Sequence, residues 1–432
     1  MGLAIAGALS LSSRLLLRTT APPSASSRSL LLLYLSTPSL LAHAASPTAL
    51  FAAPTCPVPH STSAAPPGLR SFHSSSHDRS NSSATQFSYH VAASYSAKGH
   101  KFLPERDVFT RDIFNPAKAN FSGLKACKAA LDKRRRPNSG QDSFFCSQVG
   151  TTRATAFGVA DGVGGWAESG VDPADFAHGL CEYMACAARL WPEESESASL
   201  HPKELLQVGY DEVMADTSIV GGGSTACLAV AELDGNVEVA NLGDSGFMHL
   251  GLNQVRHFTQ PQTHAFNTPY QLSKTPERML VQMAVFGGST ALSDVPKESN
   301  VTHHRVRHGD VLLFATDGVW DNLSPQDALT VVSRTMLSLG AWVEKNNVVE
   351  VSDTLNALTQ ADRREKADAG SLQSRLAIAI AKEAKVTSLN TRRDGPFAKE
   401  VQKFYPGENW HGGKPDDIAA LVAVVVEDDV SY

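Results

Sequence analysis

The chain has 432 residues, of which 42% are hydrophobic and 19% are charged. This is the composition of an ordinary globular protein, and the length suffices for one large domain or two of average size. The net charge of −6 gives no reason to expect nucleic-acid binding, and the six cysteines include no C-x-x-C pair that would indicate a zinc or redox site.

The N-terminal segment, residues 1–72, predicts a mitochondrial transit peptide. No Asp or Glu occurs before Asp78, whereas Arg14 and Arg18 stand among many Ser, Ala and Leu residues. An acid-free cationic segment of this kind is typical of transit peptides, because it is drawn toward a negatively charged compartment. Arg70 lies two residues before a phenylalanine, in a context that resembles a processing site.

Two other interpretations of this segment are weaker. A secretory signal would use the apolar run 3–11, but no basic residue precedes it. A membrane span needs about 20 apolar residues, whereas the runs 30–35 and 40–45 are separated by polar residues and a proline. We therefore expect a protein of the mitochondrial matrix with no stable membrane span, in which 73–86 is a linker.

From Phe87 onward the composition is that of a folded domain, which we expect to cover 87–430. Short apolar runs bounded by turn residues predict strands. The predicted strands are 87–95, 143–149, 155–160, 225–232, 237–242, 246–252, 254–258, 311–315 and 418–426. The turn Asp234-Gly235-Asn236 between two of these runs predicts a β-hairpin.

Helices are predicted where apolar residues recur at helical spacing behind a capping residue. Asp172 followed by Pro173 predicts one helix start, and Ser324 followed by Pro325 predicts another. The predicted helices run from 173 to about 187, 203–214, 325 to about 339, and 371–385. The segment 341–370 is polar, and we expect an irregular insertion near it. Strands grouped with strands and helices in separate blocks predict an α+β fold with largely antiparallel sheets.

Acidic residues mark the ends of several predicted strands. Five of them lie beside a glycine or another acid: Asp142, Asp161, Asp244, Asp317 and Asp416. Strand ends present side chains into a cleft from a rigid support. Carboxylates gathered there repel one another unless cations neutralise them, and hard oxygen ligands suit Mg²⁺ or Mn²⁺.

A simpler interpretation of these Asp-Gly pairs is that they form turns. Asp234-Gly235 is a pair that needs no other explanation, since it joins two alternating strands. A turn, however, does not require the two glycines that follow at 164–165, nor the Trp-Asp-Asn that follows Asp317. The combination therefore favours a site over a set of separate turns.

The ordered motifs of this chain resemble the metal-dependent protein phosphatase family (type 2C), and within it the mitochondrial branch. The motifs are GQDSFF, GVADGVGGW, GGSTA, ANLGDSGF, HAFNTPYQL, ATDGVWDN and GGKPDDIAALVAVV, and the resemblance runs from about Phe87 to Val426. It implies a central β-sandwich of two antiparallel sheets flanked by helices, in α-β-β-α layers, with a dimetal site at one end.

The resemblance also implies roles for individual residues. Asp161 would bridge two Mn²⁺ or Mg²⁺ ions, with the backbone carbonyl of Gly162 on the first ion. Asp317 and Asp416 would bind the second ion, and Asp142 would orient a water held by the metals. Asp161 and Asp142 are thus the catalytic residues. Asp244 and Asp321 match positions that can hold a third, weaker ion, whereas Asp417 has no ligand role.

The implied activity is that of a protein serine/threonine phosphatase. A hydroxide bridging the metals would attack phosphorus in line, so no phosphoenzyme and no nucleophilic Cys or Ser is needed. The substrates would be phosphoserine and phosphothreonine residues of mitochondrial proteins. We expect a monomer that does not bind nucleic acid.

Two positions depart from the family pattern. Gln141 stands where many relatives have a Glu that binds the second metal, and it would coordinate without adding negative charge. Val163 stands where relatives outside the mitochondrial branch often have a His that could act as general acid; His264 is a candidate substitute. These departures leave two alternatives open: a pseudophosphatase acting as a regulatory binding module, and a phosphohydrolase of small metabolites.

Overall fold

The computed structural model describes residues 85–110, 133–191, 199–286, 292–360 and 370–428. Contacts within the chain divide it into Met1–His77 and Asp78–Tyr432, and the described residues all belong to the second unit. The predicted transit peptide and all but the last two residues of the predicted linker lie outside the described residues.

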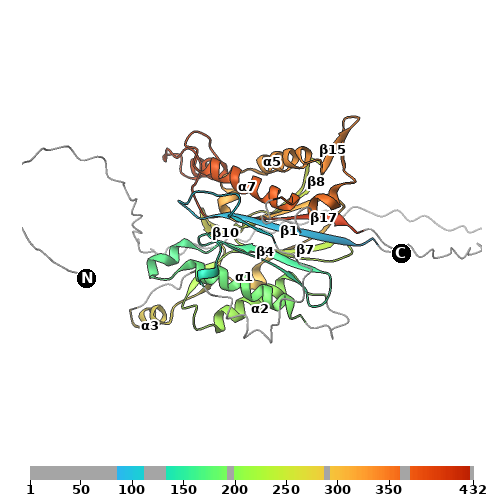
Figure 1. The fold of residues 1–432 in the computed structure, drawn as a ribbon. Helices are drawn as coiled ribbons and strands as arrows, with labels where there is room; N and C mark the ends of the chain where they lie inside the picture. The colour runs from blue at the N-terminus through green and yellow to red at the C-terminus, as the bar shows by residue number, and fades with distance from the viewer. Residues whose placement is uncertain (1–84, 111–132, 192–198, 287–291, 361–369, 429–432) are drawn as a thin grey trace, which may run out of the picture. The chain divides into compact units, whose positions relative to one another are not determined.

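Two antiparallel sheets form the centre of the fold (Figure 1). Sheet A has the order β2-β1-β17-β14-β8-β9, and sheet B has the order β13-β7-β6-β4-β3. The strands of sheet A are β1 (Phe87–Ser96), β2 (Val108–Thr110), β8 (Gly246–Gly251), β9 (Gln254–Phe258), β14 (Val311–Ala315) and β17 (Ile418–Glu427). Those of sheet B are β3 (Ser143–Gln148), β4 (Thr155–Ala160), β6 (Ala226–Ala231), β7 (Asn236–Leu242) and β13 (Asn300–Arg305).

Helices cover the outer face of each sheet. Helices α1 (Pro173–Arg189) and α2 (Pro202–Ala215) lie on sheet B, and α5 (Pro325–Ser338) and α7 (Leu372–Ser388) lie on sheet A (Figure 1). Asp172 caps α1 by accepting a hydrogen bond from the backbone of Ala174, and Ser324 caps α5 through the backbone of Asp327. Both predicted helix starts are confirmed, as is the predicted α-β-β-α layering.

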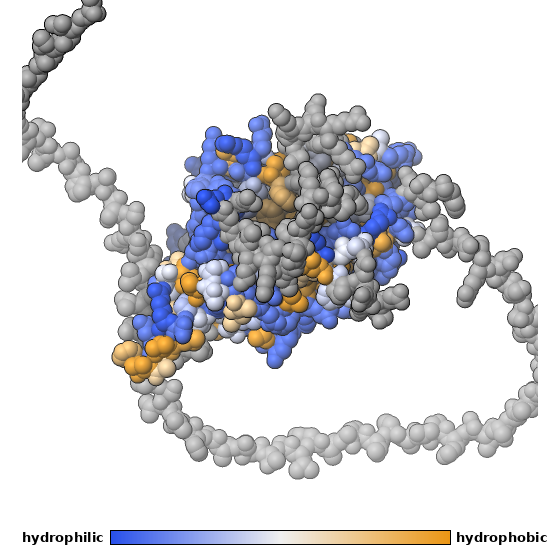
Figure 2. All heavy atoms as spheres, turned by 60° about the horizontal axis from the view of Figure 1, so that its bottom comes forward, coloured by the Kyte–Doolittle hydropathy of each residue, from blue (hydrophilic) through white to orange (hydrophobic). Residues whose placement is uncertain are grey.

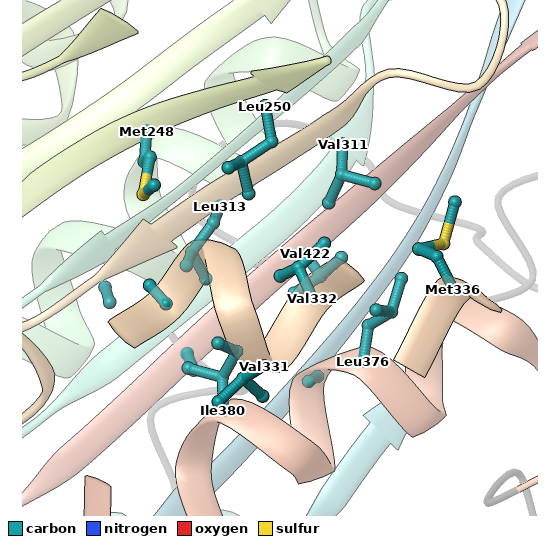
Figure 3. Close-up of a cluster of buried hydrophobic side chains, with 14 of the residues drawn as sticks. Met248, Leu250, Val311, Leu313, Val331, Val332, Met336, Leu376, Ile380 and Val422 are labelled. Carbon is teal, nitrogen blue, oxygen red and sulfur yellow. The ribbon is translucent and has the colours of Figure 1, made fainter. Parts of the chain in front are cut away.

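Three apolar layers hold these elements together. Between the sheets, Phe157 of β4 meets Phe314 of β14 edge to face, with ring centroids 5.4 Å apart. A second layer joins sheet B to α1 and α2. The third joins sheet A to α5 and α7, and Figure 3 shows Val331, Val332, Met336, Leu376 and Ile380 facing Leu313 and Val422 in it. The strands β4, β6, β14 and β17 are therefore apolar on both faces, which explains their unbroken apolar runs.

The strand register brings several strand ends to one edge of the sandwich. Ser143 at the start of β3 pairs with Ala160 at the end of β4. On the other sheet, Ala315 at the end of β14 pairs with Gly246 at the start of β8 and with Ala420 near the start of β17. Because neighbouring strands are antiparallel, the end of one strand lies beside the start of the next. The acidic residues that flank these positions therefore meet at the same edge.

The expectation of irregular structure near 341–370 is wrong for its described part. Strands β15 (Trp342–Lys345) and β16 (Val348–Val351) form a hairpin, and helix α6 (Leu355–Gln360) follows it. Asn346 and Asn347 both have positive φ, 53° and 63°, as a two-residue hairpin turn requires. Trp342 is fully buried and anchors the hairpin. Whether the segment is an insertion stays a prediction.

The remaining short strands and α-helices were not predicted. They are β5 (Gly222–Ser224), β10 (Thr263–Ala265), β11 (Thr268–Pro269), β12 (Leu272–Lys274), α3 (Glu277–Phe286), α4 (Asp317–Trp320) and α8 (Pro396–Phe404). None of the side chains of α3 is buried, and Phe286 is 84% exposed. Figure 2 shows apolar atoms gathered at the lower left, where α3 lies in Figure 1. Over the described residues, no helix combines the length and apolar character that crossing a bilayer requires.

Candidate active site

The five aspartates that the sequence singled out lie at the shared edge of the sandwich, four in loops and Asp317 at the start of a short helix. Asp142 directly precedes β3, and Asp161 directly follows β4. Asp244 lies in the turn between β7 and β8, Asp317 begins α4 directly after β14, and Asp416 lies two residues before β17. The rigid register of two sheets thus fixes the backbone positions of all five residues.

The loop after β4 is held by the G-G-S-T segment at residues 222–225. Thr225 forms hydrogen bonds with both the amide and the carbonyl of the Asp161 backbone. The Asp161 amide donates to the Thr225 hydroxyl at 3.2 Å, and the Thr225 amide donates to the Asp161 carbonyl at 3.0 Å. The amide of Val163 donates to the carbonyl of Gly223. Gly162 donates to the carbonyl of Gln141, and a Cβ at this position would come within 2.8 Å of that oxygen. Only glycine fits here without displacing the loop.

A hydrogen bond connects the two sheets inside the site. The hydroxyl of Thr316, at the end of β14, donates to Oδ2 of Asp142 at 2.7 Å and accepts from the amide of Ala419 at 3.0 Å. Asp142 and Thr316 are both buried. The second oxygen of the Asp142 carboxylate is free of this bond and can accept from another donor. Thr316 is thus a positioning residue that the sequence did not reveal.

Lys414 supplies positive charge to the acidic cluster. Its Nζ lies 2.7 Å from Oδ2 of Asp317, 2.6 Å from Oδ2 of Asp321 and 3.3 Å from Oδ2 of Asp416. Burial alone would lower the pKa of Lys414, but these carboxylates outweigh it and raise the pKa well above its usual value. The ammonium is therefore charged. The sequence signal was a basic residue two positions before a pair of acids, in GGKPDD.

The carboxylate of Asp417 links two segments of the backbone near the site. It accepts from the backbone amide of Lys98 at 2.5 Å and from that of Gln141 at 2.9 Å. These bonds tie the start of β17 to the loop before β3 and fix the backbone of Gln141. The side chain of Gln141 extends toward Gly164, because a Cβ built on Gly164 would lie 3.2 Å from Oε1 of Gln141.

The carboxylates of the cluster perturb one another. Burial, and then repulsion from neighbouring carboxylates, raises the pKa of Asp142, Asp161 and Asp321 well above the usual range. The same causes raise the pKa of Asp244 to about 7. Burial also acts on Asp317, but the nearby Lys414 reverses its effect and lowers the pKa. Full ionisation of the six aspartates would place more negative charge in the cluster than the ammonium groups of Lys414 and Lys98 balance. Ionisation of the cluster therefore favours the binding of further cations.

The donor set of the cluster fits hard divalent cations. Carboxylate and carbonyl oxygens are the ligands that Mg²⁺ and Mn²⁺ prefer, and Asp161 interacts electrostatically with Asp142, Asp317, Asp244 and Asp416. Within the described ranges, no three Asp, Glu, His or Cys side chains already stand at metal-ligand spacing. The Lys414 ammonium occupies the space between three of them, so metal binding would require those carboxylates to exchange this partner.

Of the sequence-predicted residues, the structure brings all six aspartates into one cluster and places Gln141 and Gly162 beside it. Their roles as ligands stay predictions. His264 instead pairs with Asp294, its Nε2 lying 3.0 Å from both carboxylate oxygens, and stacks on Tyr270. No contact described for His264 links it to the cluster, so its role as general acid also stays a prediction.

Thr316→Val should weaken the fold, because it keeps the shape of the side chain but leaves the buried Asp142 carboxylate without its donor. We expect the free energy of unfolding to fall by about 1–3 kcal/mol, measured by urea denaturation. Thr316→Ser, which keeps the hydroxyl, is the matched control and should lose less. Equal stability of Thr316→Val and the wild type would show that the cross-sheet bond contributes nothing.

Comparison with known proteins gives the family. The family model described as Protein phosphatase 2C matches residues 132–356. Protein phosphatase PTC7 homolog fig of Drosophila ananassae is 35% identical over 304 residues, which cover 69% of this chain and 77% of the relative. Protein phosphatase 2C homolog 7, mitochondrial, of Saccharomyces cerevisiae is 31% identical over 297 residues, which cover 68% and 76%. The solved structure of the photosystem II phosphatase PBCP matches with 25% identity and a TM-score of 0.47, covering 66% of this chain and 91% of that one.

A two-sheet sandwich with a partly buried acidic cluster at one edge is compatible with a hydrolase that acts on phosphate esters. The family model covers more than half of the chain, and the first of these relatives exceeds 30% identity over more than two thirds of it. The chain belongs to the protein phosphatase 2C family and is a protein serine/threonine phosphatase.

Proposed function

We propose that the protein is a metal-dependent phosphatase that hydrolyses phosphoserine and phosphothreonine in mitochondrial proteins. The observation that carries this proposal is the convergence of Asp161, Asp317 and Asp416 at one edge, with Asp142 held by Thr316 beside them. A dense set of partly buried carboxylates destabilises a fold unless cations compensate it. Its presence in a phosphatase is best explained by metal binding.

The residues that would hold two Mn²⁺ or Mg²⁺ ions are Asp161, Asp317, Asp416, Gln141 and the carbonyl of Gly162. Asp244 and Asp321 would hold a third, weaker ion. When bound, such ions neutralise phosphate charge and lower the pKa of water. The attribution to these residues rests on their oxygen donors and on their mutual repulsion in the fold.

The chain's own groups favour direct attack by water, in line with the leaving oxygen. Thr316 fixes one oxygen of the Asp142 carboxylate, and the other oxygen would orient the attacking water. A covalent phosphocysteine route through Cys146, Cys181 or Cys227 is disfavoured, because these three described cysteines are buried. Burial raises the pKa of Cys181 to about 12, and a thiol at that pKa is a poor nucleophile near neutral pH.

The direct test is release of phosphate from phosphothreonine peptides by the purified protein, with and without Mn²⁺ or Mg²⁺. A panel of phosphorylated small metabolites is assayed beside the peptides. Metal-dependent turnover of the peptides supports the proposal, and turnover of metabolites alone favours the metabolite phosphohydrolase. Peptide binding with no turnover at any metal concentration would favour a regulatory binding module.

The mitochondrial location is proposed from the acid-free N-terminus and from the name of the yeast relative, which includes the word mitochondrial. We expect the mature protein to begin at or a few residues after His73, because Arg70 lies just upstream. N-terminal sequencing of the protein isolated from its source checks this. A retained Met1, or a start inside 30–45 together with secretion, would contradict the location.

Gln141→Glu should tighten metal binding if Gln141 faces the second ion. An anionic ligand attracts a divalent cation more strongly than a neutral carbonyl does. We expect the Mn²⁺ concentration for half-maximal activity to fall by roughly tenfold, which corresponds to about 1–2 kcal/mol. Calorimetric Mn²⁺ titration gives the same quantity without relying on activity.

Gln148→Glu makes the same chemical change at the other end of β3 and is the matched control. It should leave Mn²⁺ affinity unchanged. Unchanged or weaker Mn²⁺ binding in Gln141→Glu would remove Gln141 from the second site.

A further inference from the structure

A cavity of about 270 Å³ opens directly beside the acidic cluster. One side is the tip of the β10–β11 hairpin, with Phe266, and the facing side is α8, with Phe397 and Glu400. Asp317 of α4 and Asp321, the residue that follows α4, line it as well. A polypeptide whose phosphorylated residue lies at the acidic cluster would therefore have a neighbouring side chain at this cavity.

The walls of the cavity are aromatic and braced. The ring of Phe266 lies 5.5 Å from that of Phe397, 5.4 Å from that of Phe404 and 5.4 Å from that of Tyr405, measured between centroids. Two aromatic side chains of α8 and that of Tyr405, the residue after α8, thus hold the hairpin tip in place. Walls fixed by such packing do not need to be ordered when a ligand binds, which favours binding.

The charged groups that line the cavity are all negative. Asp244, Asp317 and Asp321 line it on the side of the cluster, and Glu400 lies on α8 across from them. Among the described residues that line it, there is no Lys, Arg or His. Glu400 is exposed, and its carboxylate forms no hydrogen bond or ion pair with another described residue. A carboxylate free to pair, above an apolar wall, suits a long side chain that ends in a positive charge.

The chain itself shows a cation held by this combination of groups. Nζ of Lys414 lies 4.9 Å from the centroid of the Phe397 ring while it pairs with Asp317 and Asp321. The aromatic wall and the same carboxylates therefore already accommodate one ammonium. A second basic side chain in the cavity would find Phe266 as an aromatic wall and Glu400 as a carboxylate partner.

We propose that this cavity binds an arginine or lysine side chain that flanks the phosphorylated residue of the substrate, with its charge paired to Glu400. The inference rests on the proposed phosphatase activity and names a sequence preference of its substrates. The volume agrees with one side chain, since pockets for free small ligands are larger, at about 300–1,000 Å³. An acidic side chain would be repelled, and an apolar one would leave the carboxylates unpaired.

The test uses the full-length protein with Mn²⁺ and a set of phosphothreonine peptides. Arginine is placed in turn at each of the four positions on either side of the phosphothreonine, and each peptide is matched by one with citrulline, the neutral analogue. The measured quantity is the ratio of kcat/KM for the arginine and citrulline peptides. For the wild type we expect a ratio of about three to ten at one or two positions, falling at high salt.

Glu400→Lys should reduce that ratio to about one or below, because it places a positive charge at the cavity. Glu408→Lys is the matched control: Glu408 is exposed and follows α8, but it does not line the cavity. It should keep the wild-type ratio. Each ratio compares two substrates of one variant, so a general loss of activity cancels.

The outcomes separate this inference from the proposed activity. Peptide turnover with a wild-type ratio of one at every position would overturn the cavity assignment and leave the phosphatase activity intact. Equal loss of the ratio in both lysine variants would also overturn it, since the preference would then reflect overall charge. If no peptide is turned over, the proposed activity fails, and fluorescence anisotropy of the same peptides with the same three proteins decides whether arginine is preferred.

Discussion

Asp161→Asn should reduce the turnover of a phosphothreonine peptide by on the order of 10³-fold or more, without unfolding the domain. The substitution keeps the shape of the side chain and removes one negative charge from the centre of the cluster. If Asp161 bridges two metal ions, losing that charge costs several kcal/mol of transition-state stabilisation. The measurement is kcat/KM at saturating Mn²⁺.

Thermal unfolding separates this effect from a loss of structure. Without metal, Asp161→Asn should be at least as stable as the wild type, because burial and neighbouring carboxylates disfavour the charge of Asp161. With Mn²⁺, the rise in Tm seen for the wild type should be much smaller for the variant.

Asp234→Asn is the matched control, since Asp234 lies in an exposed turn of the β6–β7 hairpin and asparagine suits turns equally well. Its activity and its response to Mn²⁺ should be those of the wild type. Near-normal turnover by Asp161→Asn at saturating Mn²⁺ would contradict the assignment of Asp161 as a metal ligand.

Lys414→Met should lower the free energy of unfolding of the metal-free protein by about 3 kcal/mol, the lower end of the loss expected when one partner of a buried ion pair is removed, because this cluster is partly buried. The ammonium pairs with Asp317, Asp321 and Asp416, and its side chain is 15% exposed. Methionine fills similar volume but leaves Asp317 and Asp321 without their cation, whereas Asp416 keeps its pair with Lys98. Guanidinium denaturation in the presence of a chelator measures the loss.

Mn²⁺ should restore part of this stability, because a divalent cation can replace the lost charge. We expect the variant to bind Mn²⁺ more tightly than the wild type, in which metal must compete with the ammonium for the same oxygens. Lys403→Met is the matched control on the exposed end of α8, and it should change neither quantity. A metal-free Lys414→Met as stable as the wild type would show that the ammonium does not compensate the cluster.

The sequence determined the elements whose signals are local. Asp172 and Ser324 predicted the helix starts that the structure shows, because a capping side chain bonds to a backbone amide only two or three residues away. The buried strands were equally clear, because an unbroken apolar run such as that of β17 reflects burial on both faces of a sheet. Aspartates at strand ends indicated the acidic cluster, because antiparallel pairing places the end of one strand beside the start of the next.

Local sequence signals gave a wrong prediction where a segment rich in polar residues forms regular secondary structure. The segment 342–351 is rich in polar residues, yet it forms a hairpin because two asparagines adopt left-handed conformations and Trp342 finds a buried site. The elements α3 and α8 were missed as well. Helix α3 is mostly apolar in sequence but buries none of its side chains, so its apolar residues do not mark a core-facing stripe of the kind by which amphipathic helices are recognised.

Only the tertiary structure decided which groups meet across the site. Thr316 reaches Asp142 over a separation of 174 residues, and Asp417 binds the Gln141 amide over 276. Nothing in the local sequence specifies such contacts, because they depend on how two sheets pack and in which register. The pairing of Lys414 with Asp317 is of the same kind. The chain thus encodes its acidic residues locally, whereas the charges and hydrogen bonds that hold them depend on packing between distant segments.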